Sequence, residues 1–361
     1  MSTQAHKPMA DRSIWLPRRL LVTRSALTFP HGRAIVARAE ALGVDTVQLA
    51  GDRLSLDLPS DPRRAYADAK STLAVVVAPP SKRRLQPIAP SADWRIDLAQ
   101  GCPAHCSYCY LAGSLKGPPI TRTYANLDEI LSGVPAYEGQ GTVTSHSRHR
   151  AHEGTTFEAS CYTDPLALEP ITGSLSATIE WFGRWDASVQ LRFTSKFANI
   201  APLLDIDHQR RTRMRASINP AMFARFEGGT APVEKRLLAL REMALAGYPV
   251  GLTIAPIIAV EGWQAAYGSL LAQAATTLGD VSDDLTVELI THRFNPGSKA
   301  VLQSWYPGSS LDMSPVNRVT KRTKFGTEKE VYDVATMRAL RNFFEERIAA
   351  LLPTARILYF T

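Results

Sequence analysis

The stretch RIDLAQGCPAHCSYCY, residues 95–110, joins a short apolar run to three closely spaced cysteines. Its first part, RIDLA (95–99), is the first of six strand-like runs that alternate with helical patterns along the rest of the chain. The other five runs occupy residues 156–160, 189–194, 213–218, 250–256 and 285–290. Helices are expected between them, for example over 233–248 and 262–279. Six βα units in succession predict an α/β fold whose parallel sheet is closed or nearly closed into a barrel, with a doubly wound open sheet as the alternative.

Both folds place the ligand site at the carboxyl ends of the parallel strands. The three clustered cysteines follow the first strand, and a lone fourth cysteine, Cys161 in FEASCYTDP (157–165), ends the second. We therefore expect the cluster and Cys161 to share one rim of the sheet. Taken alone, however, a single cysteine such as Cys161 is more often a small buried residue.

A smaller α/β unit is predicted before the barrel, over residues 19–78. Its expected elements are strands at RLLVT (19–23), DTVQLA (45–50) and TLAVVVA (72–78), and a helix at GRAIVARAEALG (32–43). Residues 81–94 are rich in proline, serine and charge, so we interpret them as a linker. The predicted domains are residues 1–90 and 91–361.

Composition indicates an ordinary globular protein. The chain has 361 residues, of which 45% are hydrophobic and 21% charged, and this length buries a large core without disulfides. The sequence contains no signal-peptide pattern and no run of 18 apolar residues, so we expect a cytoplasmic protein without membrane contact. In that compartment four cysteines indicate metal binding or catalysis. The net charge of +7 indicates either a polyanionic partner or a merely basic protein.

The cysteines Cys102, Cys106 and Cys109 follow the spacing C-x3-C-x2-C. Three thiolates in one short loop can converge on one metal centre. A structural zinc site normally needs four ligands, and the neighbouring His105 is the one candidate for the fourth. Three cysteines on a cubane cluster instead leave one iron open to bind a small molecule, so the spacing favours a [4Fe-4S] site over zinc.

A polar segment at residues 138–154 interrupts the alternating pattern. It holds His146, His149 and His152, and three histidines at this spacing are a candidate metal site. Nothing in the sequence fixes their geometry, so a solvated insertion loop is the simpler interpretation, with a lid over the substrate as another.

A second polar segment, residues 317–333, carries five basic side chains around Phe325-Gly326, which we predict to be a turn. This pattern predicts a basic β-hairpin, a shape that enters a nucleic-acid groove. The alternative is a solvated charged face without a partner.

The cysteine spacing, with an aromatic residue just before the third cysteine, is similar to the signature of the radical SAM enzymes. Further stretches resemble one branch of these enzymes, the spore photoproduct lyase family, over nearly the whole chain. They are GCPAHCSYCYLAGSL, RTYANLDEI, FEASCYTD, LRFTSK, RASIN, EGWQAAY, ELITHRF and ILYFT. The resemblance implies a partial (β/α)6 TIM-type barrel with a small N-terminal α/β domain and a C-terminal β-hairpin. It also implies two cofactors, a [4Fe-4S] cluster and S-adenosyl-L-methionine.

In this family a 5′-deoxyadenosyl radical made from S-adenosylmethionine starts the reversion of spore photoproduct (5-thyminyl-5,6-dihydrothymine) in DNA to two thymines. The radical takes hydrogen from C6 of the lesion, the bond between the thymines breaks, and a cysteine returns hydrogen to the thymine methyl radical. The residues that the resemblance assigns are Cys102, Cys106 and Cys109 as cluster ligands, Cys161 as hydrogen-atom donor, Tyr108 and Tyr110 in radical transfer, and Thr163, Asp164, Lys196, Ser217 and Ala255 as cofactor contacts.

The resemblance also implies partners. They are DNA that carries a thymine-dimer-type lesion, contacted by Lys321, Arg322 and Lys324 of the basic segment, and an electron donor such as flavodoxin or ferredoxin; a monomer is expected. One position departs from the family, since Tyr162 stands after the donor cysteine where the family usually has threonine. Two alternatives remain open at this point: a radical SAM enzyme of the same architecture with another substrate, and a non-catalytic metal-containing nucleic-acid-binding protein.

Overall fold

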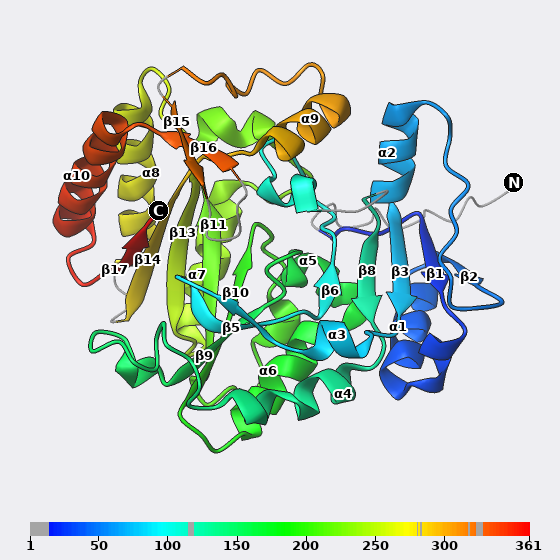
Figure 1. Ribbon diagram of the computed structural model, residues 1–361. Coiled ribbons are helices and arrows are strands. Elements are labelled where there is room, and N and C mark those ends of the chain that lie inside the picture. Colours follow the sequence, from blue (N-terminus) through cyan, green and yellow to red (C-terminus); the bar gives the residue numbers. More distant parts are fainter. Residues whose placement is uncertain (1–13, 115–118, 280, 282–283, 317, 323–327) are drawn as a thin grey trace, which may run out of the picture.

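The computed structural model describes residues 14–114, 119–279, 281, 284–316, 318–322 and 328–361. These residues form a large curled sheet with helices along its outer side and a smaller sheet beside it that carries the N-terminal segment (Figure 1). None of the described helices is both long and apolar enough to cross a membrane.

The large sheet has eight strands in the order β17-β14-β13-β11-β10-β9-β5-β4. Its strands are β4 (Gln86–Ile88), β5 (Ala92–Ile96), β9 (Thr155–Ala159), β10 (Val189–Ser195), β11 (Thr212–Ile218), β13 (Val250–Ile257), β14 (Leu285–Thr291) and β17 (Arg356–Phe360). Neighbours are parallel except β4 with β5. The end strands β17 and β4 are not paired with each other, so the sheet is a partial barrel, and the predicted fold class is confirmed.

All six predicted strands are present, and the first, β5, begins three residues before the predicted start at residue 95. The strand β17 is a seventh parallel strand that hydrophobic periodicity did not predict. It follows the C-terminal helix and is half-buried along its whole length. Its apolar run, residues 357–360, is only four residues long, and periodicity alone does not assign so short a run to a strand.

Local sequence signals place the starts of three of the six described outer helices. The six are α5 (Pro165–Thr172), α6 (Ser174–Arg184), α7 (Val233–Leu245), α8 (Trp263–Leu278), α9 (Pro296–Trp305) and α10 (Val334–Leu351). Three of them start at a side chain that accepts a hydrogen bond from the first turn, namely Asp164, Asn295 and Asp333. The helix α8 buries Tyr267, Leu270, Leu271 and Ala274, a spacing that puts them on one face.

The concave side of the large sheet is lined with paired charges rather than with apolar side chains. Arg215 on β11 contacts Glu158 on β9 and Glu288 on β14, although neither strand is its neighbour in the sheet. These contacts across the curl show that the three side chains point into the interior of the partial barrel. All three are buried.

The smaller sheet has the order β2-β1-β3-β8-β6. Its strands are β1 (Arg19–Val22), β2 (Asp45–Gln48), β3 (Thr72–Val76), β6 (Ala99–Gln100) and β8 (Thr121–Tyr124), and it is accompanied by the helices α1 (Pro30–Ala41) and α2 (Pro62–Lys70). The predicted elements of this unit are therefore confirmed. The pairing also shows that β6 and β8, which lie beyond residue 90, complete this sheet.

The predicted linker at 81–94 is largely structured. It contains most of α3 (Pro80–Arg83) and the whole of β4, which joins the large sheet by pairing with β5. Strands from each side of residue 90 thus complete the sheet of the other side. The division into domains at that residue remains a prediction.

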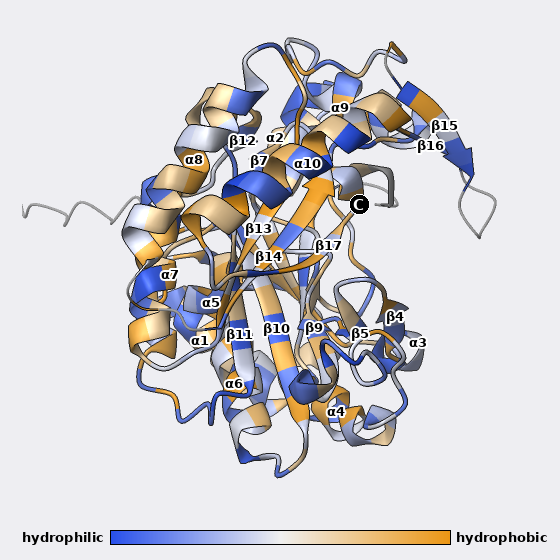
Figure 2. Cartoon of the chain, turned by 90° about the vertical axis from the view of Figure 1, so that its left-hand side faces the viewer, coloured by the Kyte–Doolittle hydropathy of each residue, from blue (hydrophilic) through white to orange (hydrophobic). Residues whose placement is uncertain are grey.

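Five further short elements belong to the fold. They are β7 (His105–Cys106), α4 (Leu127–Ser132), β12 (Glu227–Gly228), and the antiparallel pair β15 (Arg318–Arg322) with β16 (Glu328–Tyr332). The last pair confirms the predicted hairpin, and Figure 2 shows it projecting from the body of the molecule. The predicted turn at Phe325-Gly326 lies outside the described residues.

The histidine-bearing segment 138–154 lies at the amino-terminal end of β9, opposite to the rim that carries a barrel's ligand site. His146, His149 and His152 are all exposed. The segment is held by buried Asp93, which accepts hydrogen bonds from the backbone N–H groups of Val143 at 2.7 Å and of Thr144 at 3.0 Å. It therefore lies at the end of the partial barrel away from the cysteine loop, and its interpretation as a solvated loop or a lid stays a prediction.

Asp93→Asn is expected to destabilise the protein at neutral pH. Burial alone would raise the pKa of Asp93, but hydrogen bonds from Thr144, Thr156 and Val143 lower it to about 2. The pKa of an unfolded Asp is near 3.9. The folded carboxylate therefore contributes about 2 kcal/mol to the free energy of unfolding above that pH, and this stabilisation is lost as the pH falls towards 2. Urea unfolding should show the difference between wild type and variant shrinking from pH 7 to pH 2.5. The exposed Asp57→Asn is the matched control, and a pH-independent difference would contradict the prediction.

Candidate active site

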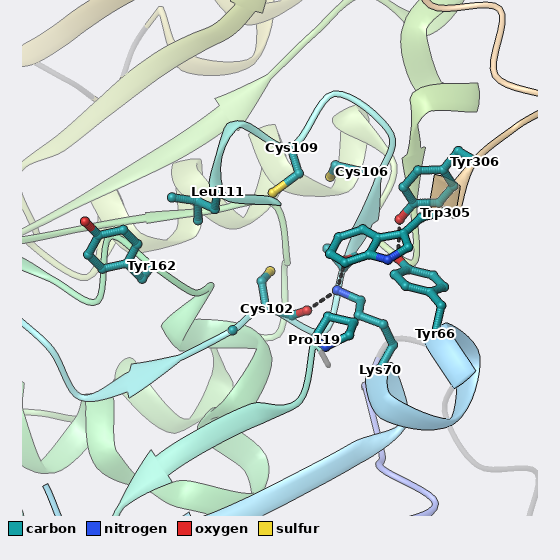
Figure 3. A pocket seen from close by; sticks show the side chains of 12 residues that line it. Tyr66, Lys70, Cys102, Cys106, Cys109, Leu111, Pro119, Tyr162, Trp305 and Tyr306 are labelled. Atoms are coloured by element: carbon teal, nitrogen blue, oxygen red, sulfur yellow. Dashed lines mark hydrogen bonds between the residues drawn. The ribbon is translucent and has the colours of Figure 1, made fainter. Parts of the chain in front are cut away.

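The loop after β5 carries the three clustered cysteines. Within it β7 pairs with β12, which places Cys106 opposite Glu227 and ties the loop to the segment after β11. Cys106 is buried, Cys102 and Cys109 are half-buried, and all three line one pocket, which Tyr162 faces from the other side (Figure 3). The structure thus brings the predicted ligands together.

The arrangement of these thiols fits a cluster better than a single zinc ion. A zinc ion needs its sulfur ligands about 2.3 Å from a common centre, and no three His, Cys, Asp or Glu side chains in the described part of the chain converge in that way. His105 is turned towards α2, since its Nδ1 is hydrogen bonded to the Tyr66 hydroxyl at 3.2 Å. A [4Fe-4S] cluster instead spreads its thiolates over several irons.

The thiols are protonated until metal is bound. Burial raises the pKa of Cys102 to about 11 and also raises the pKa of Cys109, while the Lys70 ammonium partly offsets both shifts. Since the thiolate is the ligand, cluster binding must displace protons here.

Three predicted cofactor contacts meet at the carboxyl ends of β10, β11 and β13. The backbone carbonyl of Ala255 accepts hydrogen bonds from Lys196 Nζ at 3.1 Å and from Ser217 Oγ at 3.5 Å. They meet because neighbouring parallel strands end at the same edge. Their contact with the cofactor itself remains a prediction.

The other two predicted cofactor contacts, Thr163 and Asp164, differ in their surroundings. Asp164 caps α5 through the backbone N–H of Ala167 at 3.2 Å, and it also accepts from Ser195 Oγ at 2.8 Å and the Lys196 backbone N–H at 2.7 Å. Its oxygens therefore join α5 to β10. The hydroxyl of Thr163 is buried without a hydrogen-bond partner among the described residues. A buried hydroxyl of this kind fits a ligand contact.

Glu227 is the central carboxylate of the site and was not predicted. It accepts hydrogen bonds from the Tyr108 hydroxyl, from Lys196 Nζ at 2.8 Å and from Arg236 at 2.6 Å. Burial alone would raise its pKa, but Lys196 and Arg236 hold the pKa at about 2. Glu227 is thus a fixed negative charge that positions Lys196 and Tyr108.

The two predicted radical-transfer tyrosines point in different directions. Tyr108 is buried against Glu227, and Lys196 Nζ lies 5.5 Å from its ring centre. Tyr110 is exposed, and its ring lies under the guanidinium of Arg293 at 5.5 Å. The Tyr108 hydroxyl therefore lies in the interior of the site, and the Tyr110 ring lies at its rim.

Cys161 follows the end of β9 beside an arginine that was not predicted. Arg95 forms an ion pair with Asp97 at 3.0 Å, and its guanidinium lies 4.4 Å from the ring centre of Tyr162. Burial raises the pKa of the Cys161 thiol to about 12, although Arg95 partly offsets the shift. Tyr162, the position that departs from the family pattern, is therefore the platform on which Arg95 stacks.

The base of the basic hairpin is fixed to the rim of the partial barrel. Arg318 on β15 donates to the backbone carbonyl of His292 at 3.0 Å and bonds to its Nδ1 at 2.9 Å, just after β14 ends. Its guanidinium also lies over the rings of Phe294 and Tyr332. Arg318 therefore fixes the start of β15 to the segment that follows β14.

The predicted DNA contacts Lys321 and Arg322 lie on the exposed part of β15. Lys321 is paired across the hairpin with Lys329, and Arg322 forms an exposed ion pair with Glu328 at 3.3 Å. Lys324 lies outside the described residues. The hairpin thus exposes the basic side chains of Lys321 and Arg322.

The unpredicted residues share one property: each has at least one contact with a residue far away in the sequence. Glu227, Arg95 and Lys70 are single charged residues that belong to no ligand or catalytic motif. A sequence pattern contains no signal for such pairings.

Comparison with known proteins gives matches along nearly the whole chain. Residues 15–361 match the family model described as Spore photoproduct lyase. The chain is 35% identical over 350 residues to the spore photoproduct lyases of Bacillus subtilis and of a Geobacillus species, covering 96% of this chain and 99% of each relative.

Solved structures are similar as well. A spore photoproduct lyase variant with bound AdoMet and dinucleoside spore photoproduct has a TM-score of 0.88 at 34% identity, covering 96% of this chain and 99% of that one. A spore photoproduct lyase complexed with dinucleoside spore photoproduct has the same TM-score, identity and coverage.

Proposed function

The chain belongs to the spore photoproduct lyase family, and from this membership we propose how its own residues carry out the family's reaction. It is a radical SAM lyase that reverts spore photoproduct to two thymines with a [4Fe-4S] cluster and S-adenosylmethionine. The observation that carries the proposal is that one pocket is lined by the three clustered cysteines and by Tyr162, the neighbour of Cys161.

Cys102, Cys106 and Cys109 hold the cluster in this proposal. When bound, a [4Fe-4S] cluster would supply the electron for the cleavage of S-adenosylmethionine that starts the reaction. Lys196 and Ser217 orient the cofactor from the ends of β10 and β11, and Thr163 offers its unpaired hydroxyl. Glu227 holds Lys196 in place.

Cys161 ends the reaction by giving the hydrogen atom of its S–H group to the methyl radical of the released thymine. The carbon gains a C–H bond, and the unpaired electron moves to the Cys161 sulfur. Tyr108 and Tyr110 then serve the return of the radical towards the cofactor. A protonated thiol is required, and burial keeps Cys161 in that form.

Turnover of a defined lesion tests the proposed function. The full chain, reconstituted with iron and sulfide and reduced, is incubated with S-adenosylmethionine and dinucleotide spore photoproduct. We expect thymidine products together with 5′-deoxyadenosine. A protein that cleaves S-adenosylmethionine but leaves the lesion intact would show that another substrate is used.

Duplex binding should depend on the hairpin, whereas chemistry on a dinucleotide should not. Since Lys321 and Arg322 are exposed on β15, replacing both by alanine should remove about two phosphate contacts. The slope of log K against log salt should then fall by about 2 in magnitude, with similar loss for all sequences. The exposed Lys235→Ala on α7 is the control. An unchanged salt slope would exclude the hairpin as the DNA-binding element.

The proposal also covers the partners. Lesion-containing DNA is the substrate, flavodoxin or ferredoxin is the electron donor, and the protein works as a cytoplasmic monomer. The four cysteines, all free of disulfides, agree with a reducing compartment. Light scattering of the reconstituted protein with and without DNA tests the monomer.

A further inference from the structure

Lys70 is the last residue of α2, and its side chain contacts the backbone of the cysteine loop. Its side chain is buried, and its ammonium donates to the backbone carbonyls of Cys102 and, at 2.5 Å, of Ala104. A second residue of the same helix, Tyr66, bonds to His105. The helix α2 therefore contacts the loop at two points, and Figure 3 shows Lys70 and Tyr66 on one side of the pocket.

Among the described residues, the ammonium of Lys70 has no acidic partner. Within the described chain no carboxylate lies within ion-pair distance of it. Buried lysines are almost always paired, and two carbonyl dipoles do not supply a counter-charge. The other nearby ammonium, that of Lys196, is in contrast neutralised by Glu227 at 2.8 Å.

The positive charge faces the cluster ligands. Lys70 lines the same pocket as Cys102, Cys106 and Cys109, and its ammonium donates to the backbone carbonyl of Cys102 itself. A cubane held by three thiolates is negatively charged, and one-electron reduction adds a further negative charge. A cation beside the cluster stabilises the reduced cluster more than the oxidised cluster, because the attraction grows with the negative charge of the cluster.

We propose that Lys70 tunes the reduction potential of the cluster, so that α2 makes the cluster easier to reduce. This inference rests on the proposed function, since it takes the three cysteines as cluster ligands. In this proposal α2 takes part in the chemistry, because its last residue carries the positive charge that compensates the reduced cluster. Lys70 acts through the cluster and does not touch the substrate, so it is a positioning and tuning residue.

The test is an EPR-monitored potentiometric titration of the reconstituted full chain without substrate. Lys70→Gln removes the charge and keeps an N–H donor for the two carbonyls, Lys70→Arg keeps the charge, and the exposed Lys235→Met is the surface control. At a fixed potential the glutamine variant should show at least a tenfold lower ratio of reduced to oxidised cluster, which is a shift of about 59 mV for one electron. The arginine and control variants should stay close to wild type.

Two outcomes would overturn the proposal. One is a glutamine variant that holds a full cluster and is reduced at the wild-type potential. The other is loss of iron and sulfide in the glutamine variant, which would mean that Lys70 holds the loop rather than sets the potential. A wild-type chain that binds no cluster would instead contradict the proposed function itself.

Discussion

Cys161→Ala is expected to abolish clean formation of two thymines while S-adenosylmethionine is still cleaved. The variant removes the S–H hydrogen and leaves the cysteine pocket, the cofactor contacts and the Arg95–Asp97 pair in place. The thymine methyl radical then has no donor beside it and reacts with other partners. Repair yield should fall by at least tenfold, and adducts absent from the wild-type reaction should appear.

The ratio of 5′-deoxyadenosine to thymidine, measured by chromatography on one sample, provides an internal control. It should rise sharply in the variant, because initiation continues while repair fails. The wild-type yield should also not vary through thiol ionisation between pH 6 and 9, since burial raises the pKa of Cys161 to about 12. Clean repair by the alanine variant would remove Cys161 from the mechanism.

Arg215→Met is expected to lower the free energy of unfolding by about 3–5 kcal/mol. Arg215 bonds to Glu288 at 2.6 Å and to Glu158, and all three side chains are buried inside the partial barrel. Methionine fills much of the volume but leaves buried Glu158 without its cation and Glu288 with only the more distant Arg192 at 3.8 Å. An uncompensated buried charge costs far more than the pair contributes.

Chemical denaturation at neutral pH measures this effect. Arg341→Met is the matched control, because its ion pair with Glu345 at 3.5 Å is solvent-exposed and should change stability by less than about 1 kcal/mol. Lowering the pH should reduce the difference in unfolding free energy between wild type and Arg215→Met, since protonation removes the negative charges of Glu158 and Glu288. A loss below about 1 kcal/mol in Arg215→Met would show that the interior charges do not depend on this arginine.

The parts of the site that sequence reasoning predicted well are those with a local signal. The ligand spacing of Cys102, Cys106 and Cys109 is contained in eight residues. Lys196, Ser217 and Ala255 were assigned by the family resemblance, and each lies at the end of a recognisable strand. The hairpin was predicted from its run of basic residues. In contrast, β17 lacks a periodic pattern, and the segment 81–94 was taken for a linker because its proline and charge content hid a short edge strand.

The sequence by itself determined the fold class, the cysteine loop and the rim on which the site is built, because strand periodicity and ligand spacing are properties of neighbouring residues. Only the tertiary structure decided how the charges are compensated: Glu227 between Lys196 and Arg236, Arg95 over Tyr162, and Lys70 over the cysteine loop without a carboxylate. Electrostatic interactions act through space and depend on burial, so the partner of a buried charge is set by which strands and helices the fold brings together.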